Sequence, residues 1–545
     1  MKVSVYKRCN YTFFEQIQDA ESLIIVVCEK KEAKKTMTEH NEVEERTLSR
    51  GIKAWHVSLI ALGGIIGSCY FLGLGLTFSE MGPGAVLIAY IIGGITIYGV
   101  MQSFGELLVN IPRRGSFVSY ASEFLGDTAA TGIAWSYWFN WVAYVPSEAL
   151  ATGLFMNYFI KLPFGNEAWS TFAWGVIALI LLTLVNIFQV TWFGHIESVL
   201  AMIKILAIIV FVVCGVGIWV GVIGGTLHPF TEAGGFIGSQ VILGGVGSTM
   251  EKLFPAGGLV IITYMIWTLV NFQGSEIVGL SAAETENPEK NVPNACRKVA
   301  FRIICIYVIP VFVLTMIVPY AQASLDESIF AFTLGAYGLK WAAGLFTMVT
   351  LVAAFSCANS GFYGTVRALY GLSVEGMAPK FLSNLNKFNT PQNATIFTLI
   401  PIWLVFLLGF ASDYLGLWGD GGLPLYANLL GISGFTGTLC WVGICFSQFV
   451  FRKKLKARGY NPDEVLTVKA RWYPGLALFA AFVQVGGMVL LVFEDGGIPV
   501  VVISLLAIFI PVIIYSIQKK RGKIRTNIKL GADEVKFDEK YPALK

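Results

Sequence analysis

Long apolar runs recur along most of this chain, and short polar segments separate them. A helix needs about 20 apolar residues to cross the hydrocarbon core of a bilayer. The pattern predicts twelve membrane-spanning helices, at residues 53–79, 84–108, 130–160, 170–188, 196–223, 257–283, 301–320, 341–369, 394–410, 424–451, 475–493 and 498–517. The predicted fold class is therefore an all-α membrane protein, with its membrane domain over residues 51–520.

The two ends of the chain lie outside this domain. Residues 1–50 form a polar N-terminal segment, and residues 521–545 form a charged tail that we expect to be mobile. The apolar stretch Leu23–Val27 is too short for the core of a signal peptide. A polar, acidic segment begins at Met37 and leads into the first helix. We therefore expect Met37 to be the native start and residues 1–36 to be an over-extended reading frame.

Lysine and arginine are unevenly distributed among the predicted loops. The loops on the side of the two termini carry most of them, including the basic run Arg452–Arg458. The opposite loops carry Lys161, Lys252 and Lys340. Loops rich in lysine and arginine remain on the cytoplasmic side of a membrane. This distribution predicts a multi-pass protein of the plasma membrane with both termini in the cytoplasm.

The composition supports this interpretation. Hydrophobic residues make up 55 % of the chain and charged residues 14 %, with a mean hydropathy of +0.67, which is far from an ordinary soluble domain. The nine cysteines show no spacing typical of a disulfide framework or a metal site. The sequence contains no phosphate-binding loop and no HExxH motif. It therefore indicates neither an enzyme nor a cofactor, a metal or a nucleic-acid partner.

The first predicted helix contains the glycine-rich stretch Gly63–Gly75. A broken helix is tolerated at membrane depth only where it is buried in protein or lines a cavity. The half-helix after a break presents free N–H groups and the positive end of its dipole, which together suit a carboxylate. The alternative is a glycine face for tight helix packing. The residues expected to bind a carboxylate are Ile66, Gly67, Ser68 and Cys69.

The sixth predicted helix contains a second polar stretch. An ionisable group at the centre of a membrane helix costs at least ~2.5–3.5 kcal/mol, so Glu276 requires a partner or a water-filled cavity. Phe272 is placed to close over a ligand, with core packing as the alternative. Interruptions in spans one and six predict a 5+5 inverted repeat with the substrate site between its halves. The second set of expected substrate-binding residues is Phe272, Gln273, Gly274, Ser275 and Glu276.

Lys204 is a further charge within an apolar helix. It lies eight residues into the fifth predicted span, roughly 12 Å deep at helical rise, which disfavours snorkelling to the interface. Desolvation disfavours the charged form of a buried amine, so Lys204 is able to carry a proton. Alternatively, it stays charged where another transporter binds a sodium ion. Among the carboxylates Glu148 is the deepest, whereas Glu197 and Glu284 are expected near the interface and solvated.

Taken together, these motifs resemble the amino acid permease family of the amino acid–polyamine–organocation superfamily, which has the LeuT-type fold. The similarity covers about residues 50–520. The matching motifs are Gly63-Gly64-x-Ile66-Gly67, Phe71-x-Gly73-x-Gly75, Phe193-Gly194-x-x-Glu197 with Lys204, Phe272–Glu276, Glu284-x-Glu286-Asn287-Pro288 and Asn359-Ser360-Gly361-x-Tyr363.

The resemblance implies uptake of an amino acid together with a proton. It implies that N–H groups around Gly67–Cys69 hold the α-carboxylate, and that carbonyls around Phe272–Ser275 take the α-amino group. Glu276 would belong to the site and to proton coupling. Lys204 would replace a sodium ion and reach toward span one and Ser356. The proton is the coupling ion, and no cofactor is implied.

Two departures from the family pattern matter most for the site. Cys69 and Tyr70 stand where the family usually has glycine and then an aliphatic residue, so the Cys69 side chain would intrude on the carboxylate site. Val270 stands where a large aromatic residue is common, and Trp267 one turn earlier is a candidate substitute. Together with Glu148, Val270 and Trp267 are our candidate specificity residues.

The resulting hypothesis is a secondary active transporter that imports an amino acid by proton symport. The alternative is an exchanger of external for internal amino acid, and a remote alternative is an amino acid receptor on a transporter scaffold. The expected partners are an amino acid, a proton and membrane lipid. Glu148 and Glu276 would suit a cationic substrate, but family members of differing specificity have acidic residues there, so the sequence favours no particular amino acid.

Overall fold

The computed structural model describes residues 65–113, 115–164, 166–188, 193–223, 253–280, 296, 298, 303–318, 327–386, 390–415, 425–494, 496–524 and 535–544. The chain divides into two units, one of Met1–Ser49 with Lys387–Asn389 and one of the remainder. All described residues belong to the second unit. The predictions for the N-terminal segment, including a native start at Met37, concern residues outside the described part.

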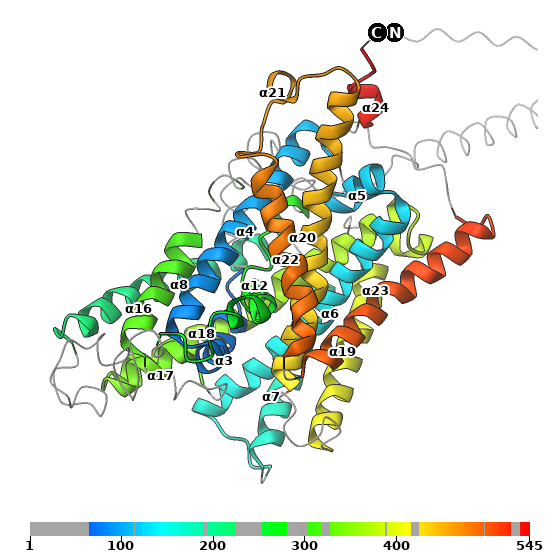
Figure 1. Cartoon of the computed structure of the whole chain (residues 1–545). Helices are drawn as coiled ribbons and strands as arrows, with labels where there is room; N and C mark the ends of the chain where they lie inside the picture. The colour runs from blue at the N-terminus through cyan, green and yellow to red at the C-terminus, as the bar shows by residue number, and fades with distance from the viewer. Residues whose placement is uncertain are drawn as a thin grey trace, which may run out of the picture. The chain divides into compact units, whose positions relative to one another are not determined.

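The second unit is helical, and its described residues include no strand. Figure 1 shows the helices. Their bounds are α3 Leu74–Met81, α4 Pro83–Asn110, α5 Phe117–Leu125, α6 Asp127–Phe159, α7 Glu167–Phe188, α8 Phe193–Trp219, α11 Val260–Thr263, α12 Met265–Val270, α13 Ile277–Leu280, α16 Ile309–Ile317, α17 Ile329–Ala336, α18 Lys340–Val374, α19 Gln392–Tyr414, α20 Leu425–Ala457, α21 Pro462–Val465, α22 Gly475–Leu490, α23 Gly497–Lys520 and α24 Phe537–Lys540. Two π-helical turns, η1 Cys69–Gly73 and η3 Ile304–Val308, precede α3 and α16, and the 3-10 turns η5 Lys380–Ser383 and η6 Leu491–Phe493 follow α18 and α22.

Within the described residues, eight helices are long and apolar enough to cross a membrane, and they fall on eight predicted spans. These are α4, α7, α8, α18, α19, α20, α22 and α23. Four predicted spans are not among them. Span one is described only from Ile65 onward, and span six is interrupted. Span seven, predicted at residues 301–320, contains the shorter apolar helix Ile304–Ile317. The total of twelve spans and the inverted repeat remain predictions.

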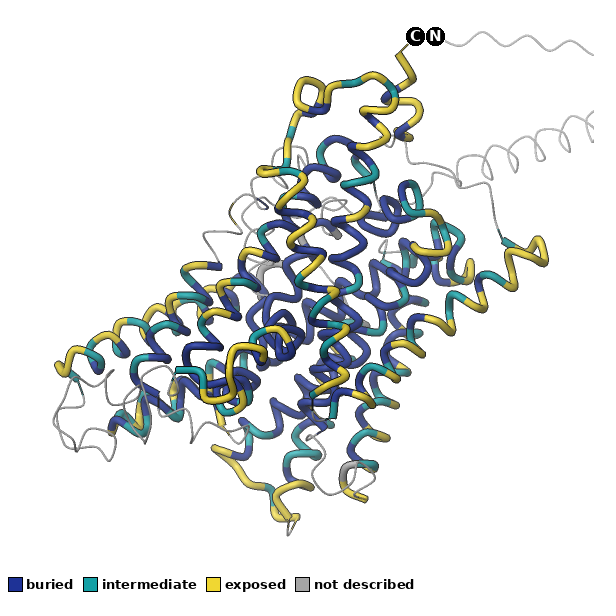
Figure 2. The backbone as a smooth tube through the Cα atoms, in the orientation of Figure 1, coloured by how far each residue is buried: buried dark blue, intermediate teal, exposed yellow. Residues whose placement is uncertain are grey.

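The remaining predicted span is α6, a helix of 33 residues surrounded by other helices. It packs against α18, α20, α7, α23, α5 and α19. Figure 2 shows buried backbone at the centre of the bundle and exposed positions on peripheral helices such as α16 and α23. Because α6 faces protein over most of its length, it tolerates polar residues such as Asn140 and Glu148, both of which are buried.

Close packing of α6 against α18 depends on one glycine. A Cβ atom at Gly361 of α18 would overlap the ring of Trp141 of α6. Trp141 is fully buried and is one of the largest side chains in the core. Small residues let membrane helices approach closely, so Gly361 allows the two helices that carry much of the site to pack against each other.

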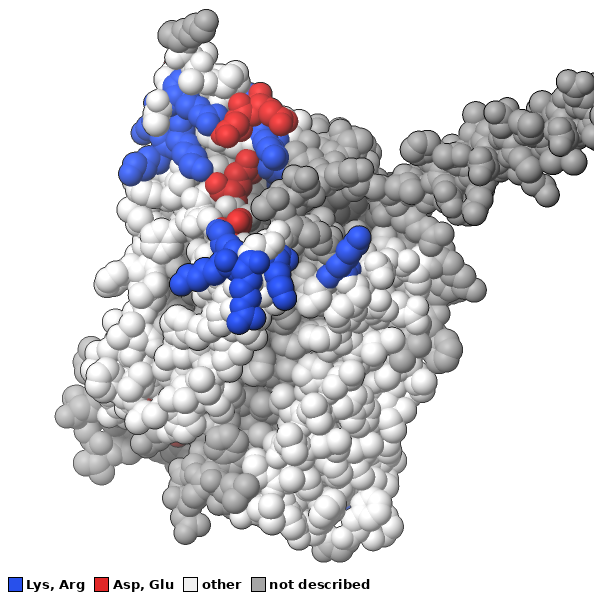
Figure 3. Space-filling model, turned by 90° about the vertical axis from the view of Figure 1, so that its right-hand side faces the viewer, with Lys and Arg blue, Asp and Glu red and all other residues white. Residues whose placement is uncertain are grey.

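Positive charge gathers at one end of the bundle. α20 ends with Lys454 and Lys456, and α23 ends with Lys519 and Lys520. On the face drawn in Figure 3, lysine and arginine lie toward the end that carries the C-terminus, and the described surface below them is almost uncharged. This is the arrangement that the positive-inside rule associates with a cytoplasmic end. The cytoplasmic location of the termini remains a prediction.

The end of the tail is packed rather than mobile, which corrects our expectation. Residues 535–544, the tail segment, lie against the charged ends of α5 and α20 (Figure 1). The backbone N–H of Phe537 donates to Glu123 at 2.8 Å, and Arg458 donates to the Tyr541 carbonyl at 2.6 Å. The Phe537 ring lies 5.6 Å from that of Phe124. Two buried aromatic residues within a charged tail were the signal that the sequence analysis overlooked.

Replacing Phe537 by alanine is expected to release the tail segment. Truncating a buried phenylalanine costs about 3–5 kcal/mol in a core, and a short docked segment has few other apolar contacts. We expect trypsin to cut after Lys536 and Lys540 at least about tenfold faster in Phe537→Ala than in the parent protein. Val535→Ala, at an exposed position, is the control. Equal cleavage rates in all three proteins would contradict the docked arrangement.

Candidate functional site

The predicted first break, called the first break below, lies at the start of the described residues, of which Ile65 is the first. Ile65, Ile66 and Gly67 are not helical, and helix begins at Ser68 and continues through η1 into α3. The backbone N–H of Ser68 donates to both carboxylate oxygens of Glu148, at 3.0 and 3.1 Å. The N–H group at this helix start is therefore hydrogen-bonded to a carboxylate of the protein itself, from α6.

Gly67 lies where a side chain has no room. A Cβ atom there would be 2.5 Å from the Tyr144 hydroxyl and 2.7 Å from the Cys357 sulfur, and it would overlap the Glu148 carboxylate. Cβ atoms essentially never approach heavy atoms this closely. Side chains of α6 and α18 therefore lie directly against the backbone at Gly67. Only glycine leaves room for such a close approach.

The second break separates α12 from α13. Residues 271–276 form turns, and Gly274 has φ +99°, a conformation that favours glycine. The Glu276 carboxylate accepts from the Gly274 N–H at 3.2 Å, from the Tyr137 hydroxyl at 3.0 Å and from the Trp441 indole at 3.0 Å. These donors meet the requirement for partners that we predicted for Glu276, and they orient its carboxylate toward α6 and α20.

The two breaks face each other across the hydroxyl of Tyr307. This hydroxyl lies 2.8 Å from the Asn271 carbonyl and 3.2 Å from the Ile65 carbonyl. The Cys69 sulfur is 4.0 Å from the Val270 carbonyl. Backbone freed by one break is therefore adjacent to backbone freed by the other, in a region where Ile66, Ser68, Phe272 and Tyr307 have at most 2 % of their surface exposed.

The expected gate residues lie around the second break. The Phe272 ring packs 4.6 Å from that of Tyr307 and 5.8 Å from that of Tyr90. Val270, at the end of α12, is buried. Trp267 donates from its indole to the Ala427 carbonyl of α20 at 3.4 Å. Phe272 is thus beside the facing breaks, whereas the indole of Trp267 is directed at α20.

Gln273 and Ser275, the remaining predicted substrate-binding residues of the second break, also have hydrogen-bond partners. The Gln273 side chain exchanges hydrogen bonds with Ser433 of α20, donating to its carbonyl at 3.0 Å and accepting from its hydroxyl at 3.0 Å. The Ser275 hydroxyl donates to the Phe272 carbonyl at 2.8 Å. Both side chains are therefore engaged in hydrogen bonds that hold the shape of the break.

Lys204 is completely buried and reaches the first break. Its Nζ donates to the Ile66 carbonyl at 3.0 Å and to the Ser356 hydroxyl of α18 at 2.8 Å. These are the contacts with span one and with Ser356 that the family resemblance implies. The Ser356 hydroxyl in turn donates to Glu197. Glu197 is buried, so our expectation of a solvated carboxylate there is wrong, because the start of α8 packs against α18.

Cys69 and Tyr70 point in different directions. The Cys69 sulfur lies 2.9 Å from the hydroxyl of Tyr144 on α6. The Tyr70 hydroxyl donates to the Ile306 carbonyl at 2.7 Å, and its ring packs 4.7 Å from that of Tyr307. Tyr70 therefore joins the surrounding scaffold, while the Cys69 thiol occupies part of the space between the first break and α6, where we expected it to intrude.

Three tyrosines at the site were missed by the sequence analysis. Tyr144 contacts Cys69, Tyr307 joins the two breaks, and the Tyr426 hydroxyl lies 2.9 Å from that of Ser68. Tyr144 is one helical turn before Glu148, and this spacing places both side chains on one face of α6. This spacing could have identified Tyr144 from the sequence. Tyr307 and Tyr426 could not be identified in this way, because they belong to helices distant in the sequence.

In the described residues, a buried helix begins at Ser68 after non-helical backbone, opposite the break between α12 and α13. Non-helical backbone buried between membrane helices is typical of secondary transporters. The sequence profile of the amino acid permease family matches residues 56–530. The chain belongs to this family of membrane transporters for amino acids.

Individual relatives agree with this assignment. The chain is 36 % identical over 431 residues to amino-acid permease RocC of Bacillus subtilis, covering 78 % of this chain and 85 % of the relative. It is 32 % identical over 452 residues to lysine-specific permease LysP of Escherichia coli, covering 82 % and 86 %. It is 33 % identical over 464 residues to the basic amino-acid permease of Saccharomyces cerevisiae, covering 82 % and 75 %.

Proposed function

We propose that this protein imports an amino acid together with a proton by alternating access, with the substrate bound between the two breaks. The observation that carries the proposal is the pair of hydrogen bonds from the Ser68 N–H to the Glu148 carboxylate. They support the view that this helix start stabilises an anion of the size and charge of a substrate carboxylate.

Substrate binding would replace one carboxylate by another. Two carboxylates at one buried helix start repel each other, so the substrate α-carboxylate displaces that of Glu148 from the Ser68 N–H. The α-amino group then binds carbonyls of the segment Phe272–Ser275, which lies across from the first break. A zwitterion thereby joins the two breaks, in the place where the Tyr307 hydroxyl contacts both of them.

Lys204 would carry the coupling proton. Its ammonium donates to the Ile66 carbonyl, one residue before Gly67, so its protonation state changes the break that holds the substrate. In the outward-facing state substrate enters while Lys204 is protonated. Binding draws the two broken helices together, and Phe272 closes the path. The scaffold then reorients, Lys204 releases its proton toward the cytoplasm, and the substrate follows.

The burial of the site supports alternating access. Residues of both breaks, such as Ile66, Ser68 and Phe272, are almost fully inaccessible to water. A substrate therefore reaches them only if helices move apart on one side of the bundle. Secondary transporters achieve this by rocking one part of the fold against another around a fixed site.

The test is uptake into proteoliposomes with an alkaline interior. Two relatives are named for lysine and for basic amino acids, so lysine is the first radiolabelled substrate, and competition by each of the twenty amino acids defines the preference. We expect accumulation that collapses when a protonophore removes the pH gradient. Uptake that is independent of the pH gradient and requires preloaded internal amino acid would contradict symport and identify an exchanger.

A further inference from the structure

A cavity lies away from the proposed substrate site, between α4 and the segment that links α21 to α22. Its volume is about 330 Å³, which is within the range of small-ligand sites. α4 contributes residues spaced by three and four positions, and therefore on one helix face. The residues used below are Tyr98, Met101 and Gln102 of α4, and Val468, Lys469 and Arg471 of the linking segment.

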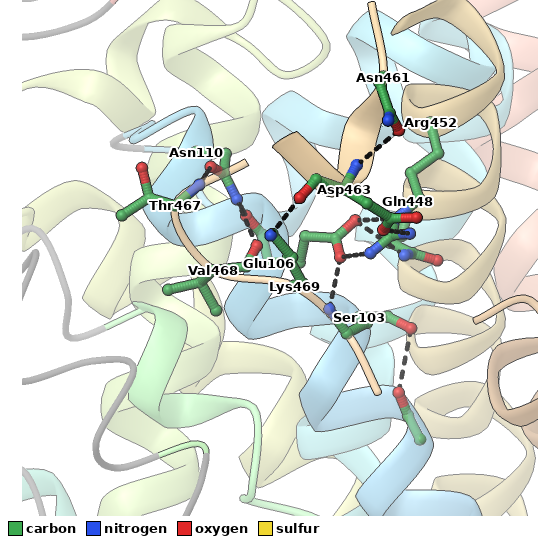
Figure 4. A network of polar contacts seen from close by, with 12 residues as sticks. Ser103, Glu106, Asn110, Gln448, Arg452, Asn461, Asp463, Thr467, Val468 and Lys469 are labelled. Atoms are coloured by element: carbon green, nitrogen blue, oxygen red, sulfur yellow. Dashed lines mark hydrogen bonds and ion pairs between the residues drawn. The ribbon is translucent and has the colours of Figure 1, made fainter. Parts of the chain in front are cut away.

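The linking segment is held in a defined position. Asn110 of α4 donates to the Val468 carbonyl at 2.8 Å and accepts from the Thr467 N–H at 2.9 Å. The Ala470 N–H donates to the Glu106 carboxylate at 2.6 Å. Figure 4 shows these bonds beside Lys469. The cationic side of the cavity is thus preorganised by hydrogen bonds between its backbone and α4.

The positive charge at this cavity is not neutralised by its lining. Lys469 and Arg471 are the charged residues that line it. The adjacent Glu106 is already paired with Arg452, at 2.6 Å between charged atoms. Lys469 donates to the Asp463 backbone carbonyl, and Arg471 makes no ion pair with any described residue. A cavity lined by two cations that form no ion pair with any described residue attracts an anion.

The surroundings of the cavity favour a lipid as the source of that anion. Trp472 follows Arg471 and has 76 % of its surface exposed, as is typical of aromatic residues at a membrane interface. Beyond it, α22 exposes apolar side chains, including Phe479 at 40 % and Phe482 at 76 %. A headgroup in the cavity would therefore have apolar helix surface next to it for its acyl chains.

We propose that this cavity binds the phosphate of an anionic phospholipid headgroup through Lys469 and Arg471. Gln102 and the hydroxyl of Tyr98 supply further hydrogen-bonding groups on the α4 side, and Met101 and Val468 supply apolar wall. Basic pockets between membrane helices at the cytoplasmic surface recognise such headgroups. The bound lipid would link α4 to the α21–α22 connection, at the predicted cytoplasmic end of the transporter.

The test measures phosphatidylglycerol binding to the purified full chain in detergent by native mass spectrometry, with phosphatidylcholine as the neutral comparison. We expect phosphatidylglycerol to bind preferentially, and the Lys469→Gln/Arg471→Gln variant to bind it at least about tenfold more weakly. Lys453→Gln/Lys456→Gln is the matched control, because it removes the same charge from exposed positions on α20. We expect the control to change binding by less than about twofold.

Two further measurements separate the possible outcomes. Arg471→Gln alone keeps the Lys469 contact and is expected to fold normally, with about fivefold weaker binding. Inorganic phosphate is expected to give a much smaller rise in unfolding temperature than phosphatidylglycerol at equal concentration. Equal protection by inorganic phosphate would overturn the lipid assignment in favour of a soluble anion. Equal losses in the double variant and its control, or equal binding of both lipids, would overturn the site itself.

Discussion

The Lys204→Ala variant is expected to lose all accumulation of amino acid driven by a pH gradient. Removing the ammonium leaves the Ile66 carbonyl and the Ser356 hydroxyl without the donor that joins them. It also removes the ammonium group that hydrogen-bonds directly to the backbone of the first break. The measurement is the steady-state ratio of internal to external substrate in proteoliposomes with an alkaline interior, which should fall to equality.

Controls separate coupling from folding in this experiment. Lys340→Ala removes an exposed lysine at the start of α18 and should accumulate substrate like the parent protein. Exchange of labelled for unlabelled substrate at equal pH should persist in Lys204→Ala if the variant folds and binds. A Lys204→Ala protein that still concentrates substrate against its gradient would remove Lys204 from the coupling mechanism.

The Gly67→Ala variant is expected to lose substrate binding. Its methyl group would lie 2.5 Å from the Tyr144 hydroxyl and 2.7 Å from the Cys357 sulfur, so these side chains of α6 and α18 must move away from the first break. Overpacking of this kind costs about 1–3 kcal/mol, which corresponds to a roughly 5- to 150-fold weaker interaction. The measurement is the Kd for the transported amino acid, taken together with the unfolding temperature.

Gly73→Ala is the matched control, because it makes the same change six residues further along the chain. The nearest atom to its added methyl group is the end of the Leu430 side chain, at 3.2 Å, and that flexible end is able to shift. We expect its Kd to stay within about twofold of the parent value. If Gly67→Ala also binds substrate normally, the backbone at Gly67 does not contact the ligand.

The interruptions themselves were readable from residue type. Glycine at positions such as Gly67 and Gly274 weakens helix, and the second of them adopts the positive φ that glycine favours. Lys204 was recognisable because a charge within an apolar run is costly. These glycines and this lysine can be recognised from neighbouring residues in the sequence, so the local sequence pattern was enough to identify them. The contact of Lys204 with Ser356 came from the family resemblance.

Other parts of the site depend on residues that are distant in the sequence. Glu148 was visible as a deep carboxylate, but its bond to the Ser68 N–H joins positions 80 residues apart. Tyr307 contacts Ile65 across 242 positions. The sequence predicted Glu197 to be a solvated carboxylate near the membrane interface. In the structure it is buried, because α18 packs against α8. No local pattern encodes such pairings, since they follow from how the helices pack.

The sequence by itself determined that this chain is a multi-pass helical membrane protein with a buried lysine, and it predicted where two interruptions lie. These features could be recognised because hydropathy, glycine content and charge can be read from a few helical turns of sequence. The tertiary structure decided that the interruptions meet at Tyr307, that Glu148 occupies the first of them, and that the tail segment docks onto α5 and α20. The physical reason is that each of these contacts requires side chains from several helices to converge, and only the packed bundle brings them together.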